Sequence, residues 1–579
     1  MAARGAMRKL RARVRQHLES IYGPTRARRL VTPLIEAMAY DGALAEPQPY
    51  RNRWDESDVW VITYAGTIHE PGRPGLQTLL EFLDAHLADC VNGVHVLPFF
   101  PYSSDDGFAV IDYLKVDRKA GSWKDVRAIA NRYRLMADLV INHGSSKSQW
   151  FRNFIDRKDP GKDYFKEASP EDDLSQVVRP RSTPLRNKVD TADGERWVWC
   201  TFGPDQVDFD FANAEVLLRF VEIIRHYLAN GIRVLRLDAV AFLWKVPGTT
   251  SQHHQRTHEI VKLLRTLVEY YDPEVMLITE TNVPNRDNLT YFGNANEAHA
   301  IYNFSLPPLL IHTLLTGDCR HLKTWIMSMP PARNATAYLN FIASHDGIGL
   351  RPADGLLSAV EMTNLLDTLV SFGGRISIRT GPDGEPHPYE VNISLFDALS
   401  GTITGADEHQ VARFVCAHAI MLALEGIPAI YIHSFLATPN DLEAVGETGR
   451  TRSINRHVWN REEIESQLRR KNSSQSIVLN ALTDLLTLRR RQKAFHPNAI
   501  QFTLHLGLEI FGVWRQSMDR EQDVFCISNI TDRPQAVSLE NVNLVSTVEW
   551  RDLITGAPVR QGQSRIELDP YQTVWLSNA

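Results

Sequence analysis

Strand-like and helix-like segments alternate along most of the chain, and this alternation limits the possible folds more than any other feature. Eight short runs rich in β-branched and other apolar residues are typical of buried strands. Between most of them lie segments such as Leu76–Leu87 and Leu217–Leu228, whose apolar residues recur at the helical period. Such an alternation predicts a (β/α)8 TIM barrel, because parallel strands need crossover helices. The strand-like runs are 59–65, 93–99, 135–142, 232–239, 275–281, 299–304, 337–345 and 427–433.

Two intervals between predicted strands are too long to be simple connections. They follow the third and the seventh strand, and long segments at the carboxyl ends of barrel strands usually form functional loops or subdomains. The end of the chain changes character, because short alternating runs separated by turn residues predict an all-β domain. The expected parts are an N-terminal helical segment (1–57), the barrel (58–142, 212–346 and 408–499), insertions B (143–211) and B′ (347–407), and a C-terminal β domain (500–579).

The fourth strand-like run ends in a charged pair, Arg236 and Asp238. Charged side chains are costly to bury unless they pair or take part in chemistry, and ligands bind at the carboxyl end of barrel strands. Asp238 is therefore either a reacting carboxylate whose charge Arg236 holds or half of a structural ion pair. This strand alone favours neither reading.

The same end of three other predicted strands carries ionisable residues. The third run leads into His143, the fifth into Glu280, and the seventh into His345 and Asp346. A single charged strand end is usually solvated, but four such ends on one rim are hard to explain in that way. They predict a catalytic site at the carboxyl face of the barrel.

Composition excludes several classes of function. A net charge of −6 gives no strong attraction to nucleic acid or anionic membranes, and no apolar run of about 18 residues predicts a transmembrane helix. The five cysteines are scattered, so we expect neither a disulfide framework nor a metal site, and a reducing, cytoplasmic setting. The basic N-terminus lacks an apolar segment typical of a secretory signal; Leu10, Val14, Leu18 and Ile21 favour a surface helix over a transit peptide. We see no dinucleotide or phosphate-loop fingerprint and expect no cofactor.

Several sequence motifs resemble one enzyme family. The ordered set DLVINH, GIRVLRLDAV, ITET and ASHD resembles the four motif regions of the α-amylase superfamily, glycoside hydrolase family 13. The stretches LPFFPYSSDDGFAVIDY, VDFDF, YNFSLPPLLIHTLLTG, SHDGIG and RSINRH resemble the sucrose phosphorylase subfamily. This resemblance implies an enzyme that transfers glucose from an α-glucoside to orthophosphate.

The resemblance also implies residue roles. Asp238 is similar to the nucleophile, Glu280 to the general acid/base, and Asp346 to the third carboxylate, which grips sugar hydroxyls. Retaining cleavage needs such a carboxylate pair, and the acid should have a raised pKa. The implied binders of the donor glucose and phosphate are Asp105, Phe108, His143, Arg236, His345 and Arg452.

One position departs from the subfamily pattern. Sucrose phosphorylases carry a phosphate-binding tyrosine after the nucleophile, and Phe242 occupies the apparent position here. Phosphorolysis remains the favoured reaction, and an α-glucosidase or transglucosylase is the alternative. Because Asp238, Glu280 and Asp346 are all present, an enzyme is favoured over a catalytically silent binding subunit. The chain is expected to act as a monomer or homodimer.

The two insertions are expected to select the group that leaves. HPYEVNISLFDAL, within the second insertion, resembles the branch that includes glucosylglycerate phosphorylase and sucrose 6′-phosphate phosphorylase, both of which release an anionic acceptor. We therefore expect 2-O-α-D-glucosylglycerate as donor, with sucrose 6′-phosphate or sucrose as alternatives. The candidate acceptor residues are Arg179, Arg181, His387, Tyr389 and Glu390. For any one of them, a solvated position in a loop without a role in binding is an equally simple interpretation.

Overall fold

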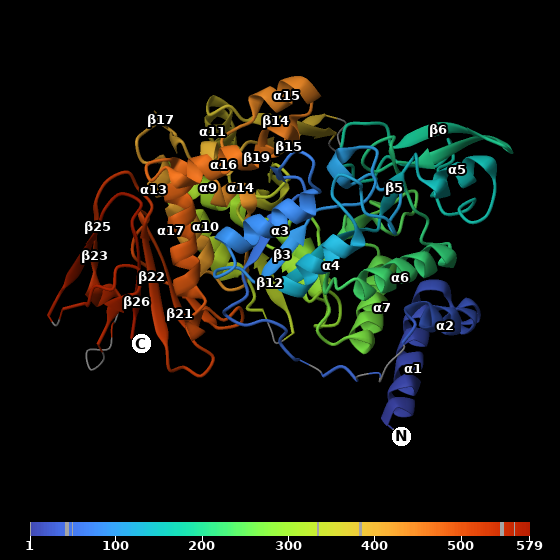
Figure 1. The fold of residues 1–579 in the computed structure, drawn as a ribbon, viewed down its shortest axis with the longest axis horizontal. Coiled ribbons are helices and arrows are strands. Elements are labelled where there is room, and N and C mark those ends of the chain that lie inside the picture. Colours follow the sequence, from blue (N-terminus) through green and yellow to red (C-terminus); the bar gives the residue numbers. More distant parts are fainter. Residues whose placement is uncertain are drawn as a thin grey trace.

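A computed structural model gives the fold of most of the chain (Figure 1). It describes residues 2–40, 44, 46–48, 50–332, 335–380, 385–542, 544, 549–560 and 562–578. Residues 381–384, which belong to the predicted acceptor loop, lie outside this set.

Eight parallel strands close into a barrel, which confirms the predicted fold class. Every barrel strand falls within one of the predicted runs or starts one residue from it. Because helices cover the barrel on the outside and side chains fill it on the inside, these strands are almost wholly buried. In barrel order they are β1 (Trp60–Thr63), β18 (Ile427–Tyr431), β12 (Ala337–Asn340), β11 (Ala300–Tyr302), β10 (Met276–Thr279), β9 (Val234–Asp238), β4 (Arg134–Val140) and β3 (Gly93–Val96).

Amphipathic helices surround the barrel, and two of them coincide with the segments singled out in the sequence. The seventh predicted strand was too long: β12 ends at Asn340, and the buried apolar residues Phe341 and Ile342 continue beyond the sheet. The principal outer helices are α3 (Gly75–His86), α4 (Trp123–Arg132), α6 (Ala214–Ala229), α7 (Gln255–Tyr271), α9 (Leu306–Thr316), α10 (Arg320–Ser328), α13 (Gln410–Ala423) and α17 (Ser474–Arg489).

Both insertions lie on the upper side of the barrel in Figure 1, over the carboxyl ends of its strands. The first contains helix α5 (Gln149–Asp156), the hairpin β6 (Arg186–Thr191) and β7 (Gly194–Trp199), and the pair β5 (His143–Ser145) and β8 (Gln206–Asp208). The second contains helix α11 (Ala359–Ser371) and an antiparallel sheet in the order β13 (Ile348–Gly349), β15 (Pro386–Asn392) and β14 (Arg375–Thr380).

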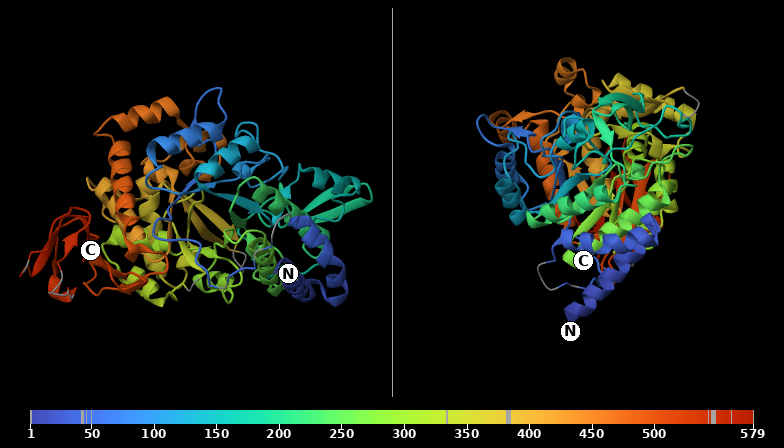
Figure 2. Two further views of the ribbon diagram at one scale, coloured as in Figure 1. Left: turned by 60° about the horizontal axis from the view of Figure 1, so that its bottom comes forward. Right: turned by 90° about the vertical axis from the view of Figure 1, so that its right-hand side faces the viewer.

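The C-terminal strands lie at the left of the molecule and the N-terminal helices toward its right in Figure 1 and in the left view of Figure 2. The N-terminal helices α1 (Ala2–Tyr22) and α2 (Pro24–Met38) contact barrel helices α7 and α6, respectively. Leu10, Val14 and Leu18 are fully buried there, as the surface-helix prediction requires. Among the described residues, no helix is both long and apolar enough to span a membrane.

The C-terminal part is built from antiparallel strands. Its larger sheet has the order β20-β21-β22-β26-β24, with bounds Ile500–Thr503, Ile510–Gln516, Asp523–Asn529, Thr573–Ser577 and Arg551–Asp552. A second pair joins β23 (Gln535–Ser538) and β25 (Arg565–Leu568).

Candidate active site

The three predicted catalytic carboxylates meet in one cavity at the carboxyl face of the barrel. Asp238 is the last residue of β9, Glu280 follows β10, and Asp346 lies beyond the end of β12. The cavity is open to solvent and has a volume of about 470 Å³. Its lining consists of Asp105, Phe108, His143, Arg181, Phe202, Gln206, Arg236, Asp238, Ala239, Glu280, Asn282, His345, Asp346, Tyr389 and Arg452.

Arg236 connects the nucleophile candidate to the interior of the barrel. Its Nη1 donates to Asp238 Oδ1 at 2.8 Å and also to Asp138. Asp138 in turn accepts a 2.7 Å hydrogen bond from His95. The guanidinium is buried between the rings of Phe108 and Tyr302. Asp238 is therefore part of an ion-pair network and also faces the cavity. It fits both interpretations of this strand, as half of an ion pair and as a carboxylate placed to react.

Glu280 lies beside the same strand end. Its Oε2 accepts a 3.0 Å hydrogen bond from the backbone N–H of Ala239, the residue after Asp238. Burial raises the pKa of Glu280, whereas Arg236 lowers it and Asp346 raises it further. Burial also raises the pKa of Asp238; Arg236 opposes this shift and the charge of Glu280 adds to it. The expected role of Arg236 in holding the charge of Asp238 stays a prediction, and the neighbouring carboxyl of Glu280 competes for the same cation.

Asp346 has the opposite electrostatic environment. Burial alone would raise its pKa, but Arg452, His345, Arg456 and Arg236 together hold the pKa well below its usual range. Arg452 Nη1 lies 2.5 Å from Asp346 Oδ1. The carboxylate is consequently held ionised, as a group that accepts hydrogen bonds from sugar hydroxyls must be.

Glu390 lies against Arg452 and does not line the cavity. Two hydrogen bonds of 2.8 Å join its carboxylate to Nε and Nη2 of Arg452. A β-bulge where β14 pairs with β15 changes the register beside Tyr389 and Glu390, and bulges redirect side chains. Both residues are buried, Tyr389 in the cavity wall and Glu390 behind it.

Aromatic and imidazole rings form the floor of the cavity. The rings of Phe108 and His345 stack at 5.0 Å with an interplanar angle of 7°. His143 Nε2 donates to the backbone oxygen of Phe108 at 3.1 Å. Gln206 donates to Asp105 Oδ2 at 3.3 Å. Burial lowers the pKa of both His143 and His345, so these rings are neutral at pH 7. The structure thus brings the predicted donor-binding residues together around one sugar-sized space.

The candidate acceptor residues divide into two groups. Arg181 and Tyr389 line the cavity, and the Arg181 guanidinium lies 5.7 Å above the Tyr389 ring. Arg179 donates to the backbone oxygen of Thr183, and neither it nor His387 is in the lining. Phe242 is also outside the lining; it packs edge-on against Phe202 at 5.6 Å.

Sequence reasoning missed Gln206, Asn282 and Phe202, which also line the cavity. Asn282 is two residues beyond Glu280, and its Nδ2 lies 3.4 Å from the Tyr389 hydroxyl. Its Oδ1 is buried and has no hydrogen-bond partner, so it can accept a hydrogen bond from a ligand. Its place directly after the ITET motif was the one available sequence signal.

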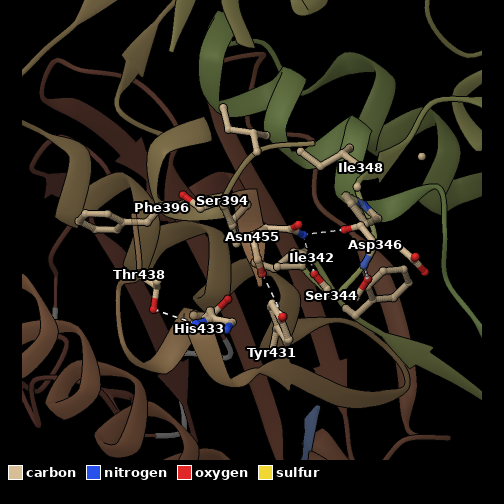
Figure 3. Close-up of a pocket in the computed structure, with 18 of the residues that line it drawn as sticks. Ile342, Ser344, Asp346, Ile348, Ser394, Phe396, Tyr431, His433, Thr438 and Asn455 are labelled. Atoms are coloured by element: carbon tan, nitrogen blue, oxygen red, sulfur yellow. Dashed lines mark hydrogen bonds between the residues drawn. The ribbon is translucent and has the colours of Figure 1, made fainter. Parts of the chain in front are cut away.

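A second cavity adjoins the first and shares Asn282 and Asp346 with it (Figure 3). In its wall, Asn455 Nδ2 donates to the backbone oxygens of Ser344 and Asp346 at 3.0 and 2.9 Å. Tyr431 in turn donates to the Asn455 backbone oxygen at 3.0 Å. Asp346 is the one catalytic candidate in its lining. The hydrogen bonds of Asn455 and Tyr431 in this wall hold the backbone from which the Asp346 carboxylate extends into the first cavity.

Comparisons with known proteins agree with this geometry. The α-amylase catalytic-domain family model matches residues 77–349. Glucosylglycerate phosphorylase of Allomeiothermus silvanus is 42% identical over 569 residues, which cover 98% of each chain. Sucrose phosphorylase of Agrobacterium vitis is 32% identical over 76% of this chain and 89% of its own. The crystal structure of sucrose 6F-phosphate phosphorylase from Thermoanaerobacter thermosaccharolyticum has a TM-score of 0.71 at 26% identity, covering 82% of this chain and 94% of that one. The chain therefore belongs to the α-amylase family, glycoside hydrolase family 13, and within it to the group that includes the glucosylglycerate and sucrose phosphorylases.

Proposed function

We propose that the protein is a retaining glycoside phosphorylase that converts 2-O-α-D-glucosylglycerate and orthophosphate into α-D-glucose 1-phosphate and D-glycerate. The observation that carries the proposal is the meeting of Asp238, Glu280 and Asp346 with Arg452 in one cavity. Relatives named glucosylglycerate phosphorylase, 38–42% identical over 98% of the chain, support the choice of donor. The five buried, free cysteines fit a reducing compartment such as the cytoplasm.

In the first step, Asp238 attacks the anomeric carbon while Glu280 protonates the oxygen of the leaving glycerate. We place the proton of the resting enzyme on Glu280. Arg236 donates directly to Asp238, whereas Glu280 receives only a neutral backbone N–H. Two buried carboxyl groups beside one shared cation do not both ionise at pH 7, and the group in direct contact with the guanidinium keeps the charge.

In the second step, orthophosphate attacks the β-glucosyl ester on Asp238 and returns the α-configuration, while Glu280, now ionised, accepts a proton from the phosphate. We assign Arg452 to the phosphate, because a guanidinium binds phosphate oxygens in pairs. The contact of Arg452 with Asp346 loosens when the sugar hydroxyls occupy that carboxylate. Phosphate can then share the Arg452 cation with Glu390.

The proposal is tested by running the reaction in reverse. The protein is incubated with α-glucose 1-phosphate and, separately, with glycerate, fructose 6-phosphate, fructose, glycerol or water alone, and phosphate release is measured. We expect release to be fastest with glycerate. Equal release with water alone would show a hydrolase and overturn the proposal. Asp238→Ala, checked for folding by thermal melting, controls for contaminating activity and should release none.

A further inference from the structure

Three arginines lie near Tyr389 of the cavity wall: Arg181 lines the cavity, whereas Arg351 and Arg379 lie outside its lining. Arg181 comes from the first insertion and lies above the Tyr389 ring. Arg351 follows β13, and the backbone N–H of its neighbour Leu350 donates to the backbone oxygen of Tyr389 at 3.0 Å. The second insertion therefore brings Arg351 next to Tyr389 through the chain itself.

The third arginine, Arg379, reaches the same place from β14. It lies opposite His387 in the antiparallel pairing of β14 with β15, and opposite residues share one face of a sheet. A β-bulge lies between His387 and Glu390, so the alternation of faces does not extend from His387 to Tyr389. The electrostatics place Arg379 near Arg351, because burial and the charge of Arg379 lower the pKa of Arg351 while the neighbouring Tyr389 raises it.

None of these three guanidiniums has an ordinary partner. Within the part of the chain that the structure describes, no hydrogen bond or ion pair joins Arg181, Arg351 or Arg379 to another side chain, although all three are half-buried. The Nε of Arg379 is buried without a hydrogen-bond partner. The other arginines at the site behave differently: Arg236, Arg452 and Arg456 each contact at least one carboxylate. Partly buried cations without a carboxylate in direct contact are costly, and a bound anion reduces that cost.

Asp354 is an acid near Arg351 and Arg379, but none of the ion pairs between described residues joins its carboxylate to either guanidinium. Burial raises the pKa of Asp354, although Arg351, Arg379 and His387 lower it in part. Burial lowers the pKa of Arg351 and so does the charge of Arg379, whereas Tyr389, Asp354 and Asp287 raise it. Among the described residues, the three guanidiniums thus have no carboxylate in direct contact.

A hydrogen-bond acceptor for a hydroxyl group of the ligand lies beside Tyr389. The unpartnered Oδ1 of Asn282 is in the cavity wall beside Glu280 and Tyr389. A leaving group with one carboxylate and one free hydroxyl, as in glycerate, matches a planar cation and an amide oxygen together.

We propose that Arg351 and Arg379 are specificity-determining residues that form, with Arg181, an anion-binding site for the carboxylate of the leaving group. The inference rests on the proposed function and adds the reason why an anionic acceptor is preferred to a neutral polyol of similar size. The guanidinium planes bind the carboxylate in pairs, and Tyr389 supports Arg181 from below.

The test compares glycerate with glycerol, which keeps the hydroxyls and lacks the carboxylate. Kinetics of phosphate release from α-glucose 1-phosphate are measured for the full chain and for Arg351→Ala, Arg379→Ala and the double variant. We expect the KM for glycerate to rise about tenfold to a hundredfold in each single variant. The kcat/KM for glycerol and the hydrolysis of α-glucosyl fluoride should change less than about twofold, because neither reaction uses a carboxylate.

Two further variants exclude a merely structural effect. Arg375→Ala is the matched control, because Arg375 is on the same strand and donates only to the backbone oxygens of Gly373 and Gly374. This variant should leave the KM for glycerate and the kcat/KM for glycerol unchanged. Arg351→Lys and Arg379→Lys should restore part of the glycerate affinity, because they keep the charge.

The outcomes separate this inference from the proposed function. Unchanged KM for glycerate in the double variant, or equal losses with glycerate and glycerol, would overturn the anion site while the reaction itself stands. If the unaltered protein used no glycerate but did use fructose 6-phosphate, the same variants compared on that sugar phosphate and on fructose would test the site. Activity with neutral acceptors alone would overturn both proposals.

Discussion

Glu390 holds the guanidinium of Arg452 by two hydrogen bonds of 2.8 Å, while the same guanidinium reaches Asp346 at 2.5 Å. Burial alone would raise the pKa of Glu390, but Arg452 and Arg181 bring it below its usual value. Glu390 therefore acts on the site through Arg452, and its predicted part in acceptor choice stays a prediction.

We predict that Glu390→Gln weakens the use of phosphate more than the chemistry on glucose. The amide no longer accepts two charged hydrogen bonds, so Arg452 loses its fixed orientation and turns toward Asp346. The KM for phosphate should rise about tenfold, with a smaller change in the hydrolysis of α-glucosyl fluoride.

Arg452→Ala is the companion variant for this prediction. It should raise the KM for phosphate at least as much as Glu390→Gln does, and in the double variant the two effects should not add, because both act through one guanidinium. Additive losses would show that Glu390 has a separate role.

Glu280→Gln should separate the acid step from the rest of catalysis. Glucosylglycerate needs its leaving oxygen protonated, whereas fluoride leaves without a proton, so the variant should lose about a hundredfold or more on the natural donor and much less on α-glucosyl fluoride. Burial raises the pKa of Glu280, and the acid works only while protonated. The kcat/KM for glucosylglycerate should therefore fall as pH rises through this raised pKa, and the variant should lack that alkaline limb. Equal losses on both donors would remove Glu280 from the acid role.

The barrel was readable from the sequence because parallel strands covered on both faces carry continuous apolar runs, as β9 and β10 do. Strand ends were less readable. Phe341 and Ile342 are as apolar as the strand before them, yet they leave the sheet and line the second cavity. A run of apolar residues predicts burial, but it does not predict which of the buried residues pair with a neighbouring strand.

The site was predictable where a residue belongs to a motif at a strand end, as Asp238 and Glu280 do. It was not predictable where position depends on how an insertion folds across the rim. Gln206 and Arg351 are ordinary polar residues in loop-like sequence, and only the strand pairing inside the two insertions brings them to the cavity wall or beside it. Tyr389 and Glu390 are adjacent in sequence, yet Tyr389 lines the cavity and Glu390 binds Arg452 behind its wall.

Phe242→Tyr should change phosphate use little. Phe202, not Phe242, lines the cavity, and the Phe242 ring is 9% exposed and packs edge-on against Phe202. A new hydroxyl in that contact must be buried with few partners, so we expect a loss of about 1–2 kcal/mol in the free energy of unfolding. The KM for phosphate should stay within about twofold of the unaltered protein. A severalfold fall in that KM would show that the missing tyrosine hydroxyl does limit phosphate binding.

Glu425 provides a prediction on stability, far from the chemistry at the opposite end of the barrel. Its Oε1 accepts a 2.6 Å hydrogen bond from the Ala332 N–H, and burial raises its pKa from 4.5 to about 7. The folded state thus binds a proton between about pH 4.5 and 7 that the unfolded chain releases. The stabilisation is complete below pH 4.5 and is lost as pH rises through 7, up to roughly 3 kcal/mol.

Glu425→Gln keeps a hydrogen-bond acceptor without the charge, so its melting temperature should equal that of the unaltered protein near pH 4.5 and exceed it at pH 8. Glu408→Gln, at a side chain 85% exposed, should show no such pH-dependent gain. A difference in melting temperature between Glu425→Gln and the unaltered protein that stays constant from pH 4.5 to pH 8 would contradict the assignment.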